Sequence, residues 1–168
     1  MQFKKYSMQK VYVETSIVSF LTARPSSNLL TAAWQSITTE WWDRRRSEFQ
    51  LFTSELVWEE ARRGDKDAAL RRQNALEGIP LLELTESAVD IAKALLSDKP
   101  VPHKAIDDAF HIALATAHCI DYLLTWNFRH IHNAETKPLI RSVVTASGYR
   151  GPEICTPQEL LGGGFNGE

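Results

Sequence analysis

The most informative segment of this chain reads Ile106-Asp107-Asp108-Ala109-Phe110-His111-Ile112-Ala113. It opens a helical pattern, from about Ala105 to Ala117, in which most of the other side chains are small and apolar. A helix this apolar is expected to lie centrally, with neighbours on several sides. Asp107 has an ordinary explanation, because the helix dipole favours an acid near the N-terminus. Asp108 does not, because it shares a face with apolar side chains, and a buried carboxylate needs a cation or several hydrogen bonds.

On both sides of this segment the sequence alternates between strand and helix patterns. Short β-branched or apolar runs bounded by polar residues predict strands at 11–13, 51–53, 80–84, 121–125 and 153–155. Apolar residues at helical spacing predict helices at about 29–46, 55–63, 67–76, 85–95, 105–117 and 137–147. Thr15 and Ser16 can cap a further turn or helix after the first strand, and Ser54 can cap the helix after the second. Such alternation predicts a parallel sheet of four or five strands with helices on both faces.

Composition limits the class of protein. A chain of 168 residues, 43% hydrophobic and 24% charged, suits one globular domain, which we place at 1–161, with a flexible Gly-rich tail at 162–168. A net charge of −2 argues against a general nucleic-acid coat protein. The two cysteines form no CxxC pair, which argues against a zinc knuckle and suits reduced thiols in the cytoplasm. We expect no membrane association, because no apolar run approaches the roughly 18 residues of a span.

Acidic side chains follow or open several of the predicted elements. Glu14 comes directly after the first strand, and ligands of parallel sheets bind beyond the carboxyl ends of the strands. Glu59 and Glu60 are adjacent on a helix, so they point in different directions. Each acid taken alone is also explained as a solvated loop or helix residue. If several of them converge with Asp108, their pKa values rise unless cations neutralise them, and such a pocket suits Mg²⁺ or Mn²⁺.

Four motifs in order resemble the PIN domain family. They are Tyr12-Val13-Glu14-Thr15-Ser16, Ser54 with Glu60 six residues later, Asp108-Ala109-Phe110-His111-Ile112-Ala113, and Leu124-Thr125-Trp126-Asn127. Order and spacing agree from Val11 to about Leu161. The resemblance implies a three-layer fold and a metal-dependent endoribonuclease, often the toxin of a type II toxin–antitoxin pair of the VapC type.

The resemblance also implies the site and its partners. Glu14, Glu60, Asp108 and Asn127 are the expected catalytic residues, and the first three are the expected ligands of Mg²⁺ or Mn²⁺. The expected partners are an RNA substrate, a small antitoxin protein and a second copy of the chain in a homodimer. Two positions depart from the family pattern, since Glu14 stands where an Asp is usual and Asn127 stands at the fourth acidic position. Asn127 can still orient a water or a neighbouring carboxylate.

Alternatives remain open at this point. His111 is expected to pack in the interior, and His130 and His132 are expected to be loop residues. The arginine pairs and runs at 44–46, 62–63 and 71–72 are read as solvated, or as RNA contacts if they surround the acids. A non-catalytic PIN fold that binds RNA or a protein would also explain the two departures. A phosphatase on a similar sheet is less well supported, because no Asp-x-Asp-x-Thr motif follows the first strand.

Overall fold

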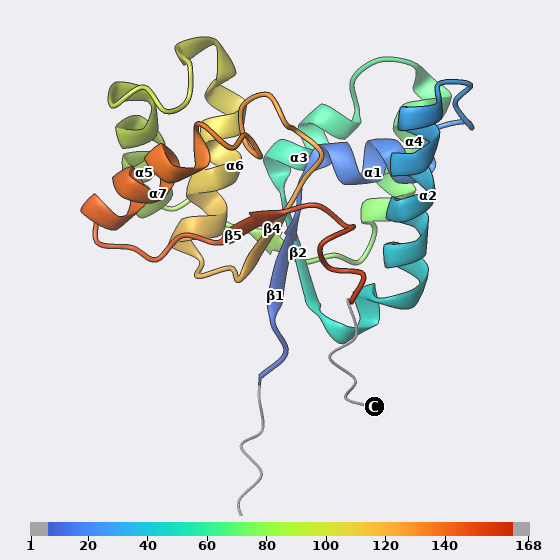
Figure 1. The fold of residues 1–168 in the computed structure, drawn as a ribbon, viewed down its shortest axis with the longest axis horizontal. Helices are drawn as coiled ribbons and strands as arrows, with labels where there is room; N and C mark the ends of the chain where they lie inside the picture. Colours follow the sequence, from blue (N-terminus) through green and yellow to red (C-terminus); the bar gives the residue numbers. More distant parts are fainter. Residues whose placement is uncertain (1–6, 163–168) are drawn as a thin grey trace, which may run out of the picture.

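The structure, a computed structural model, describes residues 7–162 and has the alternating architecture expected from the sequence (Figure 1). Its strands are β1 (Lys10–Val13), β2 (Gln50–Ser54), β3 (Leu81–Leu82), β4 (Tyr122–Leu124) and β5 (Glu153–Cys155). Its helices are α1 (Thr15–Thr22), α2 (Leu29–Arg44), α3 (Glu55–Ala61), α4 (Lys66–Leu76), α5 (Glu86–Ser97), α6 (Ile106–Ala117) and α7 (Lys137–Ala146). Two short 3-10 helices, η1 (Arg46–Glu48) and η2 (His103–Ala105), precede β2 and α6.

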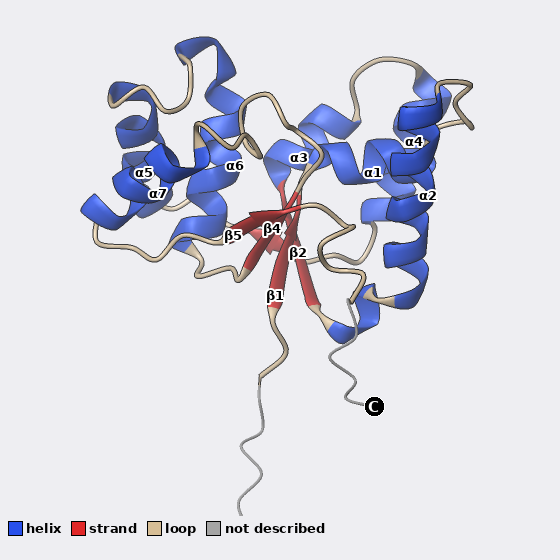
Figure 2. Ribbon diagram, viewed as in Figure 1, coloured by secondary structure: helices blue, strands red, loops and turns tan. Residues whose placement is uncertain are grey.

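All five strands are parallel, in the order β3-β2-β1-β4-β5. One group of helices, α1 to α4, packs together on one side, and α5, α6 and α7 pack together on the other (Figure 2). The predicted α/β fold, with a parallel sheet between two helical layers, is confirmed.

The centre of the fold is built from β1 and α6. Val11, Tyr12 and Val13 are completely buried, and α6 buries seven of its twelve residues, from Ala109 to Thr116, among its neighbours. This confirms that the apolar helix opened by Asp107 and Asp108 is central. Ser54 caps α3 as predicted, since its Oγ accepts a hydrogen bond from the backbone N–H of Val57 at 3.3 Å.

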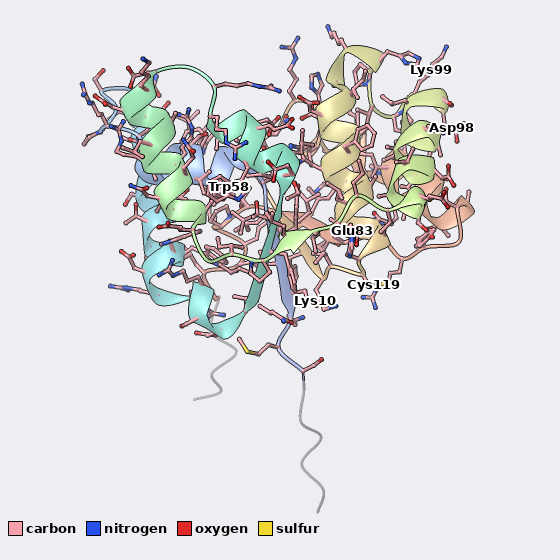
Figure 3. The ribbon with its side chains drawn as sticks, turned by 180° about the vertical axis from the view of Figure 1, so that it is seen from behind. Lys10, Trp58, Glu83, Asp98, Lys99 and Cys119 are labelled. Carbon is pink, nitrogen blue, oxygen red and sulfur yellow. The ribbon has the colours of Figure 1, made fainter. Side chains whose placement is uncertain are left out.

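The starts and the ends of the strands face opposite sides of the molecule. Lys10, at the start of β1, and Cys119, just after α6, lie toward the same lower edge when the molecule is seen from behind (Figure 3). Lys99, in the loop before α6, lies at the opposite end of that view (Figure 3). The chain therefore enters α6 on the side of the molecule where β1 ends. This brings Asp107 and Asp108, in the first turn of α6, toward Glu14, which follows β1.

Two expectations concern the ends and the helices of the chain. Of the predicted Gly-rich tail, 162–168, only Gly162 belongs to the described part, and the remainder lies outside the described residues. Among helices of the described part, none combines the length and the apolarity that crossing a membrane requires.

Candidate metal centre

The carboxyl ends of β2, β1 and β4 lie side by side, and a polar residue stands at each. Ser54 ends β2, Glu14 follows β1, and Thr125 follows β4. The backbone N–H of Glu14 donates to the carbonyl of Leu124 at 3.2 Å, which extends the ladder past the end of β1. The chain order reverses between β1 and β4, because β2 and β3 lie to one side and β4 and β5 to the other. Parallel sheets bind ligands at such switch points.

Glu14 is nearly buried, with 5% of its surface exposed, and it caps α1. Its Oε1 accepts a hydrogen bond from the backbone N–H of Ser16 at 3.1 Å, and its Oε2 accepts from the hydroxyls of Ser16 and Thr125, the latter at 2.7 Å. The cap is therefore Glu14 itself rather than the predicted Thr15 or Ser16. Ser16 Oγ also accepts from the N–H of Trp126 at 2.8 Å, which ties the end of β4 to α1. These bonds satisfy and orient the buried carboxylate.

Helix α3 brings Glu60 to the same place, while its neighbour Glu59 is exposed. Glu60 Oε2 accepts hydrogen bonds from the hydroxyl of Thr15 and from Nε2 of His111, the latter at 3.0 Å. Burial raises the pKa of Glu60, but the hydrogen bond and charge of His111, the Thr15 hydroxyl and the charge of Arg63 outweigh it and hold the pKa below its usual range. His111 is therefore the side chain that contributes most to lowering the pKa of Glu60.

His111 is part of a buried chain of hydrogen bonds. Its Nδ1 lies 2.8 Å from the hydroxyl of Tyr12, and that hydroxyl lies 2.7 Å from Ser54 Oγ. All three side chains are essentially inaccessible to solvent. His111 therefore packs in the interior, as expected, but it also holds Glu60 through one ring nitrogen and Tyr12 through the other.

The protonation of this chain of hydrogen bonds follows from its surroundings. Burial lowers the pKa of His111, but the hydrogen bond with Glu60 and the charges of Glu14, Glu60 and Asp108 raise it above the usual value. Burial raises the pKa of the Tyr12 phenol, so this hydroxyl keeps its proton. The contact between His111 and Glu60 thus favours the charged form of both side chains.

Asp108 lies on the first turn of α6 and has its own two partners. Its Oδ1 accepts from Asn127 Nδ2 at 3.0 Å, and its Oδ2 accepts from His130 Nδ1 at 2.8 Å. Asn127 Oδ1 accepts the backbone N–H groups of Arg129 and His130 at 3.2 and 3.0 Å. Both ends of the Asn127 amide are therefore occupied, one in shaping the loop after β4 and the other in orienting Asp108.

The predicted site residues fall into two adjoining groups. Ligand atoms of Glu14, Glu60 and His111 lie within 4.8 Å of one another, and this group does not include Asp108. Asp108 and Asn127 form the second group, joined to the first because the N–H of Asn127 donates to Thr125 Oγ1 at 2.9 Å and this hydroxyl bonds Glu14. Carboxylate oxygens with one imidazole nitrogen form a donor set that fits a divalent cation.

Basic and aromatic residues flank the acids. Arg63, two residues after the end of α3, pairs with Asp107 at 3.6 Å, and both side chains are exposed. Phe128 and Arg129, next to Asn127, are also exposed. The run at 44–46 spans the end of α2 and the start of η1, before β2, so it lies on the side of the molecule where the strands begin; there Arg46 stacks on Trp42 at 4.7 Å.

Three residues of the site had not been assigned a role there from the sequence. Tyr12 lies two residues before Glu14 in a strand and so shares its face. His111 lies three residues after Asp108, on the same side of the helix. His130 lies three residues after Asn127, but no periodic pattern in a loop would have indicated its contact with Asp108.

Comparison with protein families identifies one match, in which the model of the PIN domain covers residues 11–135. The matched segment contains every residue of both groups described above. No curated protein matches the chain.

Proposed function

Because the chain belongs to the PIN domain family, whose members are generally metal-dependent nucleases, we propose that it is a Mg²⁺- or Mn²⁺-dependent endoribonuclease that hydrolyses RNA phosphodiester bonds. The observation that carries the proposal is the meeting of Glu14 and Glu60 at the switch point of the sheet, with Asp108 in the adjoining group that Thr125 and Asn127 link to Glu14. Carboxylates that come from three elements far apart in sequence repel one another when they converge, so their convergence suits a shared cation.

Glu14, Glu60 and Asp108 are the residues that we propose hold the metal. A divalent ion at this point would supply electrostatic stabilisation of a phosphodiester and a lower pKa for an attacking water. Asn127 has the role of orienting Asp108, because its Nδ2 donates to that carboxylate while its Oδ1 accepts two backbone N–H groups of the following loop.

The surrounding side chains hold the acids in place before any ligand arrives. Thr125 and Ser16 fix Glu14, and Thr15 and His111 fix Glu60. A site whose ligands are already oriented loses little entropy when the ion binds. This arrangement supports catalysis more than incidental clustering of surface acids.

Substrate contacts are proposed for the exposed residues next to the acids. Phe128 exposes 40% of its surface and offers a face on which a single-stranded base can stack. Arg129 and Arg63 can meet phosphate groups on either side. Such local contacts are compatible with a net charge of −2, because they need no basic surface elsewhere.

A nuclease free in the cytoplasm would damage its own cell, so we propose that this one is the toxin of a type II toxin–antitoxin pair. A small protein inhibitor would silence the site by placing an Arg among the acids, since guanidinium groups pair well with carboxylates. The same reasoning from the family leads us to propose a homodimer. Harmless overexpression, together with purification from the native host without a small partner, would count against the toxin role.

One observation favours a second candidate, a PIN fold that binds RNA or a protein without cleaving RNA. Both carboxylate oxygens of Asp108 are already bonded, to Asn127 and to His130. An acid satisfied in this way has less need of a metal ion.

A cleavage assay separates the two candidates. The purified chain is incubated with a mixed pool of structured RNAs, with Mn²⁺ and with excess chelator. We expect cleavage with Mn²⁺ and none in chelator. Binding of RNA without cleavage under either condition would favour the second candidate, and cleavage that persists in chelator would contradict the metal-dependent mechanism.

A further inference from the structure

One of the atoms gathered at the candidate metal centre is a nitrogen. Glu14, Glu60 and His111 each offer one ligand atom, and these three atoms lie within 4.8 Å of one another. Two ligands of one ion, each about 2.0–2.2 Å from it, are at most about 4.4 Å apart. Small side-chain movements would therefore close all three onto one ion.

Glu60 does not depend on His111 as its only donor. Its Oε2 also receives the hydroxyl of Thr15, while the Nε2 of His111 approaches the same oxygen at 3.0 Å. When Nε2 gives up its proton and turns its lone pair to an ion, Glu60 keeps the hydrogen bond from Thr15. The exchange therefore leaves no unsatisfied carboxylate oxygen at this contact.

The second ring nitrogen of His111, Nδ1, has a hydrogen-bond partner that would support the binding of metal by Nε2. Nδ1 of His111 meets the Tyr12 hydroxyl at 2.8 Å, and that hydroxyl meets Ser54 at 2.7 Å. A hydroxyl both donates and accepts, so Tyr12 can accept from Nδ1–H while it donates to Ser54. A metal-bound histidine typically donates its second N–H to such a partner, which fixes the ring and its tautomer.

Asp108 is less available than His111 for the first contact with an ion. Its oxygens are engaged by Asn127 at 3.0 Å and by His130 at 2.8 Å, and neither of these partners has a substitute in the described part of the chain. Each of these oxygens keeps a free lone pair, but Asp108 is not part of the group in which the ligand atoms of Glu14, Glu60 and His111 lie within 4.8 Å of one another.

We propose that Nε2 of His111 is a ligand of the metal ion, together with Glu14 and Glu60. The inference rests on the proposed function, since it assigns a further ligand to the same ion. Imidazole suits first-row transition metals, whereas Mg²⁺ is bound mainly by oxygen. The mixed donor set therefore selects Mn²⁺ over Mg²⁺.

Pulsed electron paramagnetic resonance of the full chain loaded with Mn²⁺ alone tests the proposal without any activity measurement. A directly bound imidazole gives a ¹⁴N modulation of the Mn²⁺ echo, and labelling histidine with ¹⁵N changes its pattern. We expect this modulation in the wild type, its retention in His130→Gln and its loss in His111→Gln. Among described residues, His111 and His130 are the imidazoles hydrogen-bonded to an acid of the site, so His130→Gln is the matched control.

The outcomes are distinct. Bound Mn²⁺ without ¹⁴N modulation, or modulation lost in His130→Gln, would overturn the assignment of His111 and leave the proposed function standing. Failure of the wild type to bind Mn²⁺ at all would overturn both. If His111→Gln does not fold, wild-type modulation that changes with ¹⁵N-histidine and survives in His130→Gln still supports His111.

Discussion

Replacing Thr125 by Val tests whether the hydroxyls around Glu14 serve the metal centre. Thr125 is completely buried, and Val has nearly the same shape, so the substitution removes the hydroxyl with little change in packing. The hydroxyl donates to Glu14 Oε2 at 2.7 Å and accepts from the backbone N–H of Asn127 at 2.9 Å. The variant loses both bonds.

The expected cost follows from these two contacts. A hydrogen bond to a charged group contributes about 1.5–3 kcal/mol, and a buried N–H left without an acceptor costs about 1–3 kcal/mol. Because the two effects overlap, we expect Thr125→Val to lower the free energy of unfolding by about 2–4 kcal/mol. For a chain of this size that is a fall in Tm of about 5–15 °C. The loosened Glu14 should also weaken Mn²⁺ binding by roughly 10–100-fold, as loss of a partner of a ligand usually does.

Thr38→Val is the matched control. Thr38 is also completely buried, accepts from Trp126 Nε1 at 2.8 Å and donates to the carbonyl of Trp34 at 2.6 Å, but it touches no acid. Calorimetric titration with Mn²⁺ and thermal unfolding in chelator are measured for both variants. We expect both to be destabilised and only Thr125→Val to lose Mn²⁺ affinity. Equal Mn²⁺ affinity in the two variants would refute the claim that Thr125 positions a metal ligand.

Three other predictions follow from neighbouring contacts. Asp108→Asn should abolish RNA cleavage while thermal unfolding stays cooperative, and normal cleavage by this variant would remove Asp108 from the site. Asn127→Asp should lower the Tm in chelator, because it replaces the side chain that donates to Asp108 by a second carboxylate. Calorimetry should show that the same variant binds Mn²⁺ more tightly. Unchanged stability and unchanged Mn²⁺ affinity would contradict this prediction. Burial raises the pKa of Glu159, but hydrogen bonds from Thr156 and His132 outweigh this effect and lower the pKa. The Glu159 carboxylate should therefore stabilise the fold above its unfolded-state pKa of about 4.3. This stabilisation should disappear as the pH falls through the lower pKa of the folded state. Denaturation of wild type and Glu159→Gln between about pH 7 and 3 should thus show a stability difference that vanishes in acid, and a difference that persists would be inconsistent with the assigned contacts.

The order of the elements and some of their bounds could be predicted from local patterns, although the strand predicted at 80–84 is observed only at 81–82 and the helix predicted to end at 63 ends at Ala61. The strand predicted at 153–155 is observed at those residues, and the helices predicted at 67–76 and 137–147 are observed at 66–76 and 137–146. These agreements arise because caps such as Ser54 and the periodic spacing of apolar residues act over a few residues. The order of strands in the sheet could not be read in the same way, since it depends on how the helical crossovers pack.

Candidate site residues could be proposed from the sequence where their position next to a strand or on a helix indicated it. Glu14 was identified because it follows a strand, and helix geometry indicated that only one of Glu59 and Glu60 could face the site. The partners of the acids were not predictable. His111 and Glu60 are 51 residues apart, and their contact depends on how α3 and α6 meet across the end of the sheet. The same holds for His130 and Asp108, because an irregular loop places that imidazole.

The central claim is that acids at the carboxyl edge of the sheet make this PIN domain a metal-dependent ribonuclease, and one comparison tests it most directly. The rate of RNA cleavage with Mn²⁺ is measured for Glu60→Gln and for Glu55→Gln, which lies on the same helix but pairs with Arg62 at the surface. We predict that Glu55→Gln cleaves at the wild-type rate and that Glu60→Gln does not cleave. Equal cleavage by the two variants would contradict the claim, because it would show that the carboxylate of Glu60 has no part in the reaction.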